Sequence, residues 1–339
     1  MTVSIKEVAK KAGVTISTVS RVFNHYPDVL PETREKVLRA AQQLNYVPNA
    51  NARSLSAKKP PNLCLIASDV LNDNSRDSML YLQMKGLLRF TMEHNLELAL
   101  CNTDSREQSR YHFTDFCKLH AISAAIVTGV KTDDPYFLEL MESGIPVVAI
   151  DIPLEGNHTG WVSIDNRKAS EEAMNALYGL GLQNVLVLAG RQNAVVNDTR
   201  LCGVHAACTQ AGLSLEHKIL YADFNEEKAY EQTLSYLSCN PLPEAVFCFS
   251  DIMALGVLRA LREKQISVPD QVSVLGFDGM PFCTLTTPTL STVQQDMQKL
   301  GYEAASLAYD LMREVPLETH HRIVSHQVIL RESVRANQS

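Results

Sequence analysis

Apolar residues in the first 45 positions recur at the spacing of amphipathic helices. In the first segment they are Ile5, Val8, Ala9 and Ala12, which form one stripe at i, i+3, i+4 and i+7. Ser4 and Glu7 have the spacing of a capping box, so we expect this helix to begin at Ile5. Gly13 then ends the helix and permits a tight turn.

A second helix is expected from a cap at Thr15 to about Phe23, with Val19 and Val22 directed inward. The residues left on its outer face are Ile16, Ser17, Ser20 and Arg21. A third helix begins at Pro31. Its apolar face comprises Val37, Leu38, Ala41 and Leu44. Helix, glycine turn and helix in this order is the layout of a helix-turn-helix, whose second helix reads a DNA groove.

The stretch after these helices is short and polar. Residues 50–56 are compatible with a helix but are too few to be stable alone, so they need a partner to become ordered. Residues 57–62 are basic and contain a Pro pair, which is typical of a linker. We therefore expect a DNA-binding domain at 1–48, a hinge helix and linker at 49–61, and a core at 62–339.

From residue 62 onward, short apolar runs alternate with helical patterns. Strands are expected at 63–67, 96–101, 124–128, 146–150, 162–164, 185–189, 218–220, 245–249 and 272–277. Helices are expected at 79–94, 107–119, 134–143, 168–180, 199–211, 226–237, 251–264 and 296–312. This alternation predicts an α/β fold with doubly wound parallel sheets in two lobes. Ligands of such folds bind at the carboxyl ends of the strands and in the crevice between lobes.

The formal net charge of −7 conceals two different parts of the chain. The first 59 residues carry ten Lys and Arg against four Asp and Glu, whereas the remainder carries 21 against 34. Because DNA phosphates attract Lys and Arg, this asymmetry favours a small nucleic-acid reader attached to a large acidic body.

The sequence contains none of the spacings that mark common catalytic or metal sites. The eight Cys form no CxxC pair, which indicates the reduced thiols of a cytoplasmic protein. A signal-peptide pattern and an apolar run of membrane-spanning length are both missing, so no membrane partner is expected. Glycine-rich nucleotide loops, a Gly-x-Ser-x-Gly elbow and His/Cys clusters are missing as well. We therefore expect no catalytic residues, no metal and no cofactor.

Several motifs resemble those of one known family. They are Val8-Ala9-x-x-Ala12-Gly13-Val14-Thr15-x-Ser17-Thr18-Val19-Ser20-Arg21-Val22-x-Asn24, Leu44-Asn45-Tyr46-x-Pro48-Asn49, Ser250-Asp251-Ile252-Met253-Ala254 and Val274-Leu275-Gly276-Phe277-Asp278. With them the chain resembles, over essentially its whole length, the LacI/GalR family of bacterial transcription regulators. The resemblance implies a homodimer on palindromic double-stranded operator DNA, with helix-turn-helix units in major grooves and paired hinge helices in the central minor groove. It also implies a small-molecule effector between the two lobes.

The same resemblance assigns DNA-binding roles. Ile16 and Ser17 occupy the positions that discriminate operators, and Arg21 contacts a base or a phosphate. Leu55 stands where the family inserts a leucine wedge into the operator, with Ala52 packed beside it. The implied DNA-binding residues are Thr15, Ile16, Ser17, Ser20, Arg21, Asn24, Asn49, Ala52, Arg53 and Leu55. Two alternatives stay open: Arg21 only neutralises a phosphate, or Leu55 belongs to a solvated linker.

The implied effector contacts come from both lobes. Asp151 and Asp278 offer carboxylates to vicinal hydroxyls, Arg200 offers a fork of donors, and Phe224 offers an aromatic surface. Further candidates are Ser68, Asn197, Ser250 and Gln295. This combination favours a sugar, with a nucleoside or another metabolite as the alternative. A sugar phosphate would require more cations than the sequence reveals.

The chain departs from the family in two places. Leu30 precedes Pro31 where the family usually has a Ser or Thr cap, so the third helix relies on the proline. Where the family often has an aromatic pair after the first core strand, this chain offers Met79 and Leu80, which leaves the effector open. The Asp165-Asn166 pair is interpreted as a turn before a helix rather than as a ligand contact.

Among the competing functions, an enzyme would lack a site, and a sugar-binding protein without a regulatory role would leave the first 59 residues unexplained. A repressor of a carbohydrate-utilisation operon accounts for both parts. Its control would be allosteric, because an effector that reorients the lobes changes whether the hinge segments pair on DNA. The sequence does not fix whether the effector releases or promotes DNA binding. No leucine heptads follow the core, so we expect a dimer rather than a tetramer.

Overall fold

The computed structural model describes residues 4–23, 26, 29–44, 46, 62–68, 77–192, 194–214 and 218–336. The chain divides into two compact units, Met1–Pro60 and Pro61–Ser339. The expected hinge helix and linker at 49–61 lie outside the described residues, so the hinge stays a prediction.

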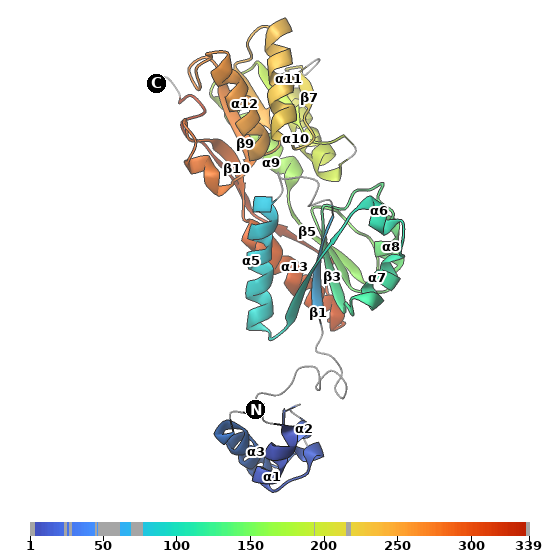
Figure 1. Cartoon of the computed structure of the whole chain (residues 1–339). Helices are drawn as coiled ribbons and strands as arrows, with labels where there is room; N and C mark the ends of the chain where they lie inside the picture. The colour runs from blue at the N-terminus through green and yellow to red at the C-terminus, as the bar shows by residue number, and fades with distance from the viewer. Residues whose placement is uncertain are drawn as a thin grey trace. The chain divides into compact units, whose positions relative to one another are not determined.

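Three described helices form the first unit (Figure 1): α1 (Ile5–Ala12), α2 (Ile16–Phe23) and α3 (Pro31–Gln43). Their buried core consists of Val8, Ala9, Val19, Val22, Val37, Ala40 and Ala41. The backbone N–H of Ser4 donates to Oε2 of Glu7 over 2.6 Å, and Gly13 follows α1 with a φ of 66°. The predicted capping box, glycine turn and helix-turn-helix layout are therefore confirmed.

α3 begins without a side-chain cap. Leu30 provides no cap hydrogen bond, while Pro31 supplies the φ that the first helical position requires. Arg34 then ties the start of α3 to the end of α2. Its guanidinium donates to the carbonyl oxygens of Val22 at 3.3 Å and Tyr26 at 2.8 Å. Tertiary contacts thus replace the missing cap.

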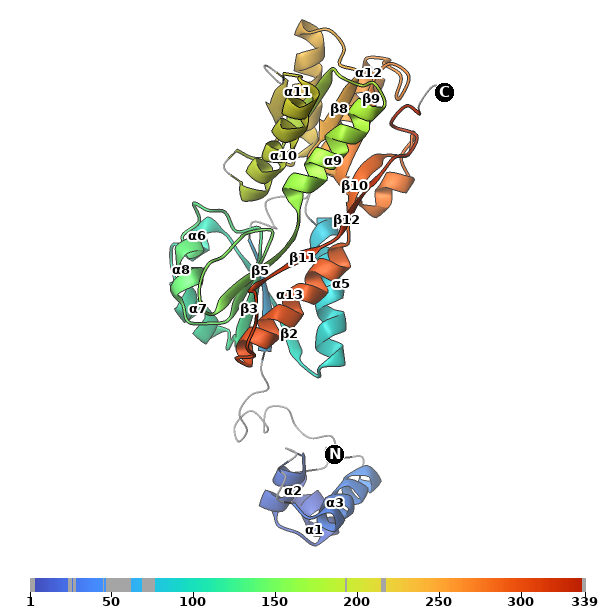
Figure 2. The ribbon, with the colours of Figure 1, turned by 180° about the vertical axis from the view of Figure 1, so that it is seen from behind.

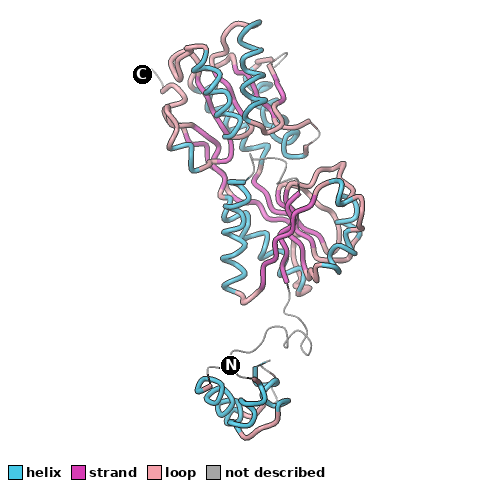
Figure 3. The backbone as a smooth tube through the Cα atoms, in the orientation of Figure 1, coloured by secondary structure: helices cyan, strands magenta, loops and turns pink. Residues whose placement is uncertain are grey.

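The second unit comprises two lobes, each built on a six-stranded sheet (Figure 3). In the first lobe the strand order is β11-β5-β4-β3-β1-β2. The strands are β1 (Asn62–Ser68), β2 (Glu97–Thr103), β3 (Ala124–Thr128), β4 (Val147–Ile150), β5 (Thr159–Ile164) and β11 (His321–Val324). The helices are α5 (Asp77–Glu93) and α13 (Met297–Met312) on one face, and α6 (Ser105–Gln108), α7 (Phe113–Leu119) and α8 (Tyr136–Glu142) on the other (Figure 1).

β1 shows why the strands read as continuous apolar runs. Leu63 and Leu65 belong to the core that includes residues of α5 and α13. Cys64 and Ile66 belong to the separate core that includes residues of α7 and α8. Because helices cover both faces of a parallel sheet, every position of a central strand is buried.

The second lobe repeats this plan with the strand order β12-β10-β9-β8-β6-β7. Its strands are β6 (Val185–Ala189), β7 (Ile219–Tyr221), β8 (Ala245–Cys248), β9 (Ser273–Asp278), β10 (Ser291–Gln295) and β12 (His326–Ile329). Its helices are α9 (Asn166–Gly179), α10 (Val195–Ala211), α11 (Glu226–Cys239), α12 (Asp251–Glu263) and the 3-10 turn η2 (Pro281–Thr284). β12 pairs with β10 in the antiparallel sense, so this sheet is mixed. From the sequence, only parallel strands were predicted.

The chain passes between the lobes after β5, after β10 and after β11. α13 follows β10 of the second lobe but packs against α5 and the sheet of the first lobe. Likewise, β11 joins the first sheet, and β12 begins two positions after β11 ends and joins the second sheet (Figure 2). Neither lobe is therefore contiguous in sequence.

Two groups of elements differ from the sequence prediction. The single helix expected at 107–119 is divided into α6 and α7. Asp104 caps α6 by accepting from the N–H of Glu107 over 2.8 Å, and the helix ends at Gln108. The strands β10, β11 and β12 were not predicted, because they acquire their pairing from residues that are distant in sequence. Among the described helices, none combines the length and apolar character needed to cross a membrane.

Candidate functional site

The outer face of α2 carries the predicted DNA-reading side chains. Val19 and Val22 fix this helix to the core, which leaves Ile16, Ser17 and Arg21 exposed and Ser20 half-buried. Oγ1 of Thr15 accepts from the N–H of Thr18 over 3.1 Å. The Thr15 hydroxyl is therefore the cap of α2, as predicted.

Arg21 lies against an aromatic ring that the sequence analysis did not single out. Its guanidinium carbon is 5.2 Å from the centroid of the Tyr26 ring, and Tyr26 is itself exposed. Such a cation–π contact restricts the rotamers of the arginine. The remaining predicted DNA contacts lie outside the described residues: Asn24, Asn49, Ala52, Arg53 and Leu55.

A cavity of about 220 Å³ opens between the two lobes of the second unit. Six of the eight predicted effector contacts line it: Ser68, Asp151, Arg200, Phe224, Ser250 and Asp278. The other two stand behind the lining. Oδ1 of Asn197 accepts from the N–H of Gly190 over 2.7 Å, and Nε2 of Gln295 donates to Oδ1 of Asp278 over 3.0 Å. Asn197 and Gln295 therefore position the cavity wall.

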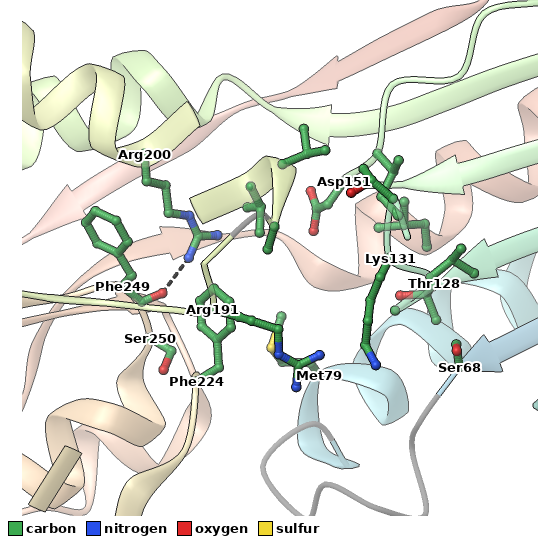
Figure 4. A pocket seen from close by; sticks show the side chains of 18 of the residues that line it. Ser68, Met79, Thr128, Lys131, Asp151, Arg191, Arg200, Phe224, Phe249 and Ser250 are labelled. Atoms are coloured by element: carbon green, nitrogen blue, oxygen red, sulfur yellow. Dashed lines mark hydrogen bonds between the residues drawn. The ribbon is translucent and has the colours of Figure 1, made fainter. Parts of the chain in front are cut away.

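Arg200 is the most deeply buried cation of this cavity, with 3% of its surface exposed. Its Nε donates to Oδ1 of Asn166 over 2.8 Å, and its Nη1 donates to the carbonyl oxygen of Phe249 (Figure 4). The guanidinium carbon lies 3.6 Å from the ring centroid of Phe277. Burial lowers the pKa of Arg200, and the nearby charges of Asp278 and Asp151 oppose that shift. The arginine is thus a rigid donor fork.

The two carboxyl groups near Arg200 are also buried. Burial raises the pKa of Asp151, while a hydrogen bond of 2.6 Å from Ser163 and the charge of Arg200 counteract it. Burial likewise raises the pKa of Asp278 well above its ordinary value. Carboxylates that have lost water are stabilised by hydroxyl groups that donate to them. This end of the cavity therefore suits a ligand with several hydroxyls.

Three residues that line the cavity have strained backbones. Asp151 has a φ of 66°, Phe224 of 59° and Asp278 of 119°, all in the left-handed region that non-glycine residues avoid. A Cβ placed on Gly190 would lie 2.0 Å from Cζ of Phe224, so only glycine allows this ring its position. Strained residues that gather around one cavity are typical of a functional site.

Two further cations line the cavity away from Arg200. Lys131 follows β3 of the first lobe, and Arg191 follows β6 of the second lobe. Both are half-buried, and Figure 4 shows their side chains extending toward the same side of the cavity, away from Asp151 and Arg200. The cavity therefore has an acidic and hydrogen-bonding end and a cationic end.

Residues 4–49 match the bacterial regulatory proteins of the lacI family, and residues 174–334 match a periplasmic binding protein-like domain. The match of residues 4–49 supports the predicted resemblance to the lacI family. The HTH-type transcriptional repressor PurR of Pasteurella multocida (strain Pm70) is 29% identical over 339 residues, which covers 98% of this chain and 99% of that protein.

Two solved structures are similar to this chain over nearly its whole length. A complex of the transcriptional regulator CelR with cellobiose is 27% identical, has a TM-score of 0.73, and is matched over 98% of this chain and 99% of its own. The lac repressor dimer bound to operator shares the fold with a TM-score of 0.83 at 22% identity, over 99% of this chain and 100% of its own. These similarities support the predicted DNA-binding transcription regulator with an effector-binding core, and the relatives named are transcription regulators rather than enzymes.

Sequence reasoning missed three residues of the cavity region. Asn166 was interpreted as part of a turn, yet it is buried and holds the guanidinium of Arg200, while its neighbour Asp165 caps α9. Lys131 and Arg191 were not recognised as cavity residues. A sugar phosphate was considered unsuited because the sequence revealed too few cations. Their position just after predicted strands was the available signal, because the carboxyl ends of parallel strands border the ligand site.

Proposed function

We propose that this regulator represses a carbohydrate-utilisation operon in the cytoplasm and is controlled by a sugar bound between its lobes. The observation that carries this proposal is the arrangement of Asp151, Arg200 and Asp278 around one end of the cavity, with the ring of Phe224 in its wall. Carboxylates and a guanidinium accept from and donate to vicinal hydroxyls, and an aromatic ring packs on the C–H face of a sugar ring. The cellobiose complex of CelR supports a carbohydrate.

The DNA-binding part of the proposal rests on the exposed face of α2. Residues 1–48 form the reading domain, residues 49–61 the hinge and linker, and residues 62–339 the effector-binding core. Ile16, Ser17 and Arg21 stand exposed on one helix, where they can meet base edges in a major groove. The operator complex of the lac repressor dimer, which shares the fold, supports this arrangement.

A homodimer is supported by an apolar stripe on the first lobe. Tyr81, Leu88 and Met92 are exposed at helical spacing along α5, and Leu100 is exposed on the neighbouring edge strand β2. Solvent contact of large apolar side chains in one continuous patch is unfavourable, and a second copy removes it. Two copies would also present two reading helices to the halves of a palindromic operator.

Allosteric control follows from the way the lobes are joined. Asp151 belongs to the first lobe and Arg200 to the second, so one ligand that binds both changes the relative free energies of the lobe arrangements. A coupling free energy of about 1–3 kcal/mol would suffice to switch DNA binding. Contacts between the hinge segments at 49–61 would transmit the change to the DNA-binding domains.

The proposal is tested in two stages with the full chain. Selection from random duplexes should enrich a palindrome, and failure to enrich any sequence would favour a sugar-binding protein without a regulatory role. Thermal shift with sugars, nucleosides and amino acids should then identify sugars, and each hit is added to an operator titration. The Arg200→Met variant should lose the response while Arg110→Gln, an exposed arginine outside the cavity, keeps it. If nucleosides bind instead of sugars, the effector is the alternative, a nucleoside.

A further inference from the structure

The cationic end of the cavity lies away from the carboxylates that suit the hydroxyls of a sugar (Figure 4). Lys131 and Arg191 come from different lobes, line one cavity and lie beyond the hydrogen-bonding end formed by Asp151 and Arg200. Asp133 is an additional acidic residue of the lining and is exposed. The positions of these charges along the cavity therefore indicate which chemical groups the ligand carries.

The backbone that carries each cation is firmly held. The N–H of Lys131 donates to Oδ2 of Asp134 over 2.9 Å, and Oδ1 of the same carboxylate accepts from Oγ of Ser105 over 2.6 Å. Asp134 is buried, so the loop after β3 is fixed from within the lobe. These bonds fix the backbone from which the Lys131 side chain extends.

Arg191 is placed just as firmly. It follows Gly190, whose N–H donates to Oδ1 of the buried Asn197 and whose Cα lies beneath the Phe224 ring. Arg191 therefore directly follows the glycine that packs against the Phe224 ring. Figure 4 shows Arg191 and Lys131 directed toward the same side of the cavity.

We propose that the effector is an acidic sugar, which carries a carboxylate or a phosphate between Lys131 and Arg191 and its hydroxyls at Asp151 and Arg200. Arginine binds carboxylate and phosphate oxygens with a planar pair of donors, and lysine adds a compact charge. An anion held by one cation from each lobe would also draw the lobes together. The inference rests on the proposed function, because it specifies the sugar bound in the same cavity.

The test uses matched pairs of ligands with the full-length protein. Isothermal titration compares glucuronate, galacturonate, gluconate and glucose 6-phosphate with their neutral parents glucose, galactose and sorbitol, and with inorganic phosphate and acetate as free anions. At least one acidic sugar should bind, its neutral parent should bind about 10- to 100-fold more weakly, and the affinity of the acid should fall with added salt. Comparison of the sugar acids with glucose 6-phosphate shows whether the bound anionic group is a carboxylate or a phosphate.

Charge-neutral variants locate the anion. Lys131→Gln and Arg191→Gln should each weaken binding of the acidic sugar by about 10-fold or more. Arg110→Gln removes an exposed arginine outside the cavity and should have no effect. The operator titration also verifies that each variant is folded.

The outcomes separate this inference from the proposed function. Neutral sugars that bind as well as their acids, with unchanged affinity in Lys131→Gln and Arg191→Gln, would overturn the acidic sugar and leave the sugar effector standing. Binding of nucleosides or amino acids but of no sugar would overturn the proposed function itself. If none of the acids binds, the inference is likewise overturned.

Discussion

Arg200 and Asn166 are joined by a hydrogen bond of 2.8 Å from Nε of the arginine to Oδ1 of the amide. Nδ2 of Asn166 donates in turn to Oγ of Ser163 over 3.0 Å, and that hydroxyl donates to Oδ1 of Asp151 over 2.6 Å. Ser163 lies on β5, and Asn166 begins α9 directly after the chain has passed between the lobes. A continuous chain of hydrogen bonds therefore links the cavity carboxylate of one lobe to the cavity arginine of the other through the connection between them.

Replacement of Asn166 should weaken both stability and effector response. Asn166→Ala leaves the buried Nε of Arg200 without its acceptor, which costs about 1–3 kcal/mol of unfolding free energy. Effector affinity should fall as well, because Arg200 loses its fixed orientation. Urea unfolding and effector titration measure the two effects. Asn240→Ala, which removes an exposed amide just after the end of α11, should change neither by more than about 0.5 kcal/mol.

The stability of the second lobe should depend on pH through Asp251. This carboxyl accepts hydrogen bonds from Oγ1 of Thr292 at 2.6 Å and from the N–H of Met280 at 2.8 Å, yet burial raises its pKa to about 6. The unfolded chain has a value of about 3.9, so between these values the folded state binds more protons. Its stability must then decrease as pH rises from about 4 to about 6, by about 3 kcal/mol for this group.

Unfolding of the wild type and of Asp251→Asn at several pH values measures this contribution. The free-energy advantage of the wild type over the variant should be larger at about pH 4 than at about pH 7. The exposed Asp270→Asn variant controls for the general effect of losing a carboxylate. An advantage that grows with pH would contradict the raised pKa.

DNA recognition should depend on Arg21 at individual base positions. Arg21→Ala should cost about 1–3 kcal/mol of discrimination at one position of the half-site if the guanidinium grips a guanine. Titration against operator variants provides the measurement. A uniform loss across all sequences would instead assign Arg21 to a phosphate. Tyr26→Phe retains the ring beneath the guanidinium and should preserve the discrimination, whereas Tyr26→Ala should reduce it.

The glycine beneath Phe224 can be tested by a double-mutant cycle. Gly190→Ala places a methyl group in the space of the Phe224 ring, so it should cost about 1–3 kcal/mol of stability and weaken effector binding. Gly190→Ala combined with Phe224→Ala should recover much of that stability, because the smaller side chain no longer meets the methyl group. Additive effects in thermal unfolding would show that the two residues do not conflict.

A substitution in the proposed dimer surface should lower the mass of the particle in solution from dimer to monomer. Leu88→Asp places a charge in the apolar stripe of α5 and should shift sedimentation toward the monomer and weaken operator binding. Leu119→Asp introduces the same charge at an exposed leucine of α7, on the other face of the sheet, and should leave the dimer intact. Equal sedimentation of both variants and the wild type would argue against this surface.

The sequence by itself determined the elements that local forces specify. The capping box of Ser4 and Glu7, the turn at Gly13 and the stripe of Val19 and Val22 depend only on residues a few positions apart, so periodicity sufficed to predict α1 and α2. The apolar strands were visible because burial on both faces leaves a continuous run. Motifs resembling a known family brought Asp151 and Arg200 to attention before any geometry.

Only the tertiary structure decided how distant residues meet. The strands β10 to β12 depend on partners far away in the chain, and β12 adopts the antiparallel direction that no local pattern indicates. Lys131 and Arg191 border one cavity because two lobes face each other, and Asn166 acts on Arg200 because α9 and α10 pack together. Such contacts are set by packing across long sequence separations, and the pattern of apolar and polar positions contains no record of them.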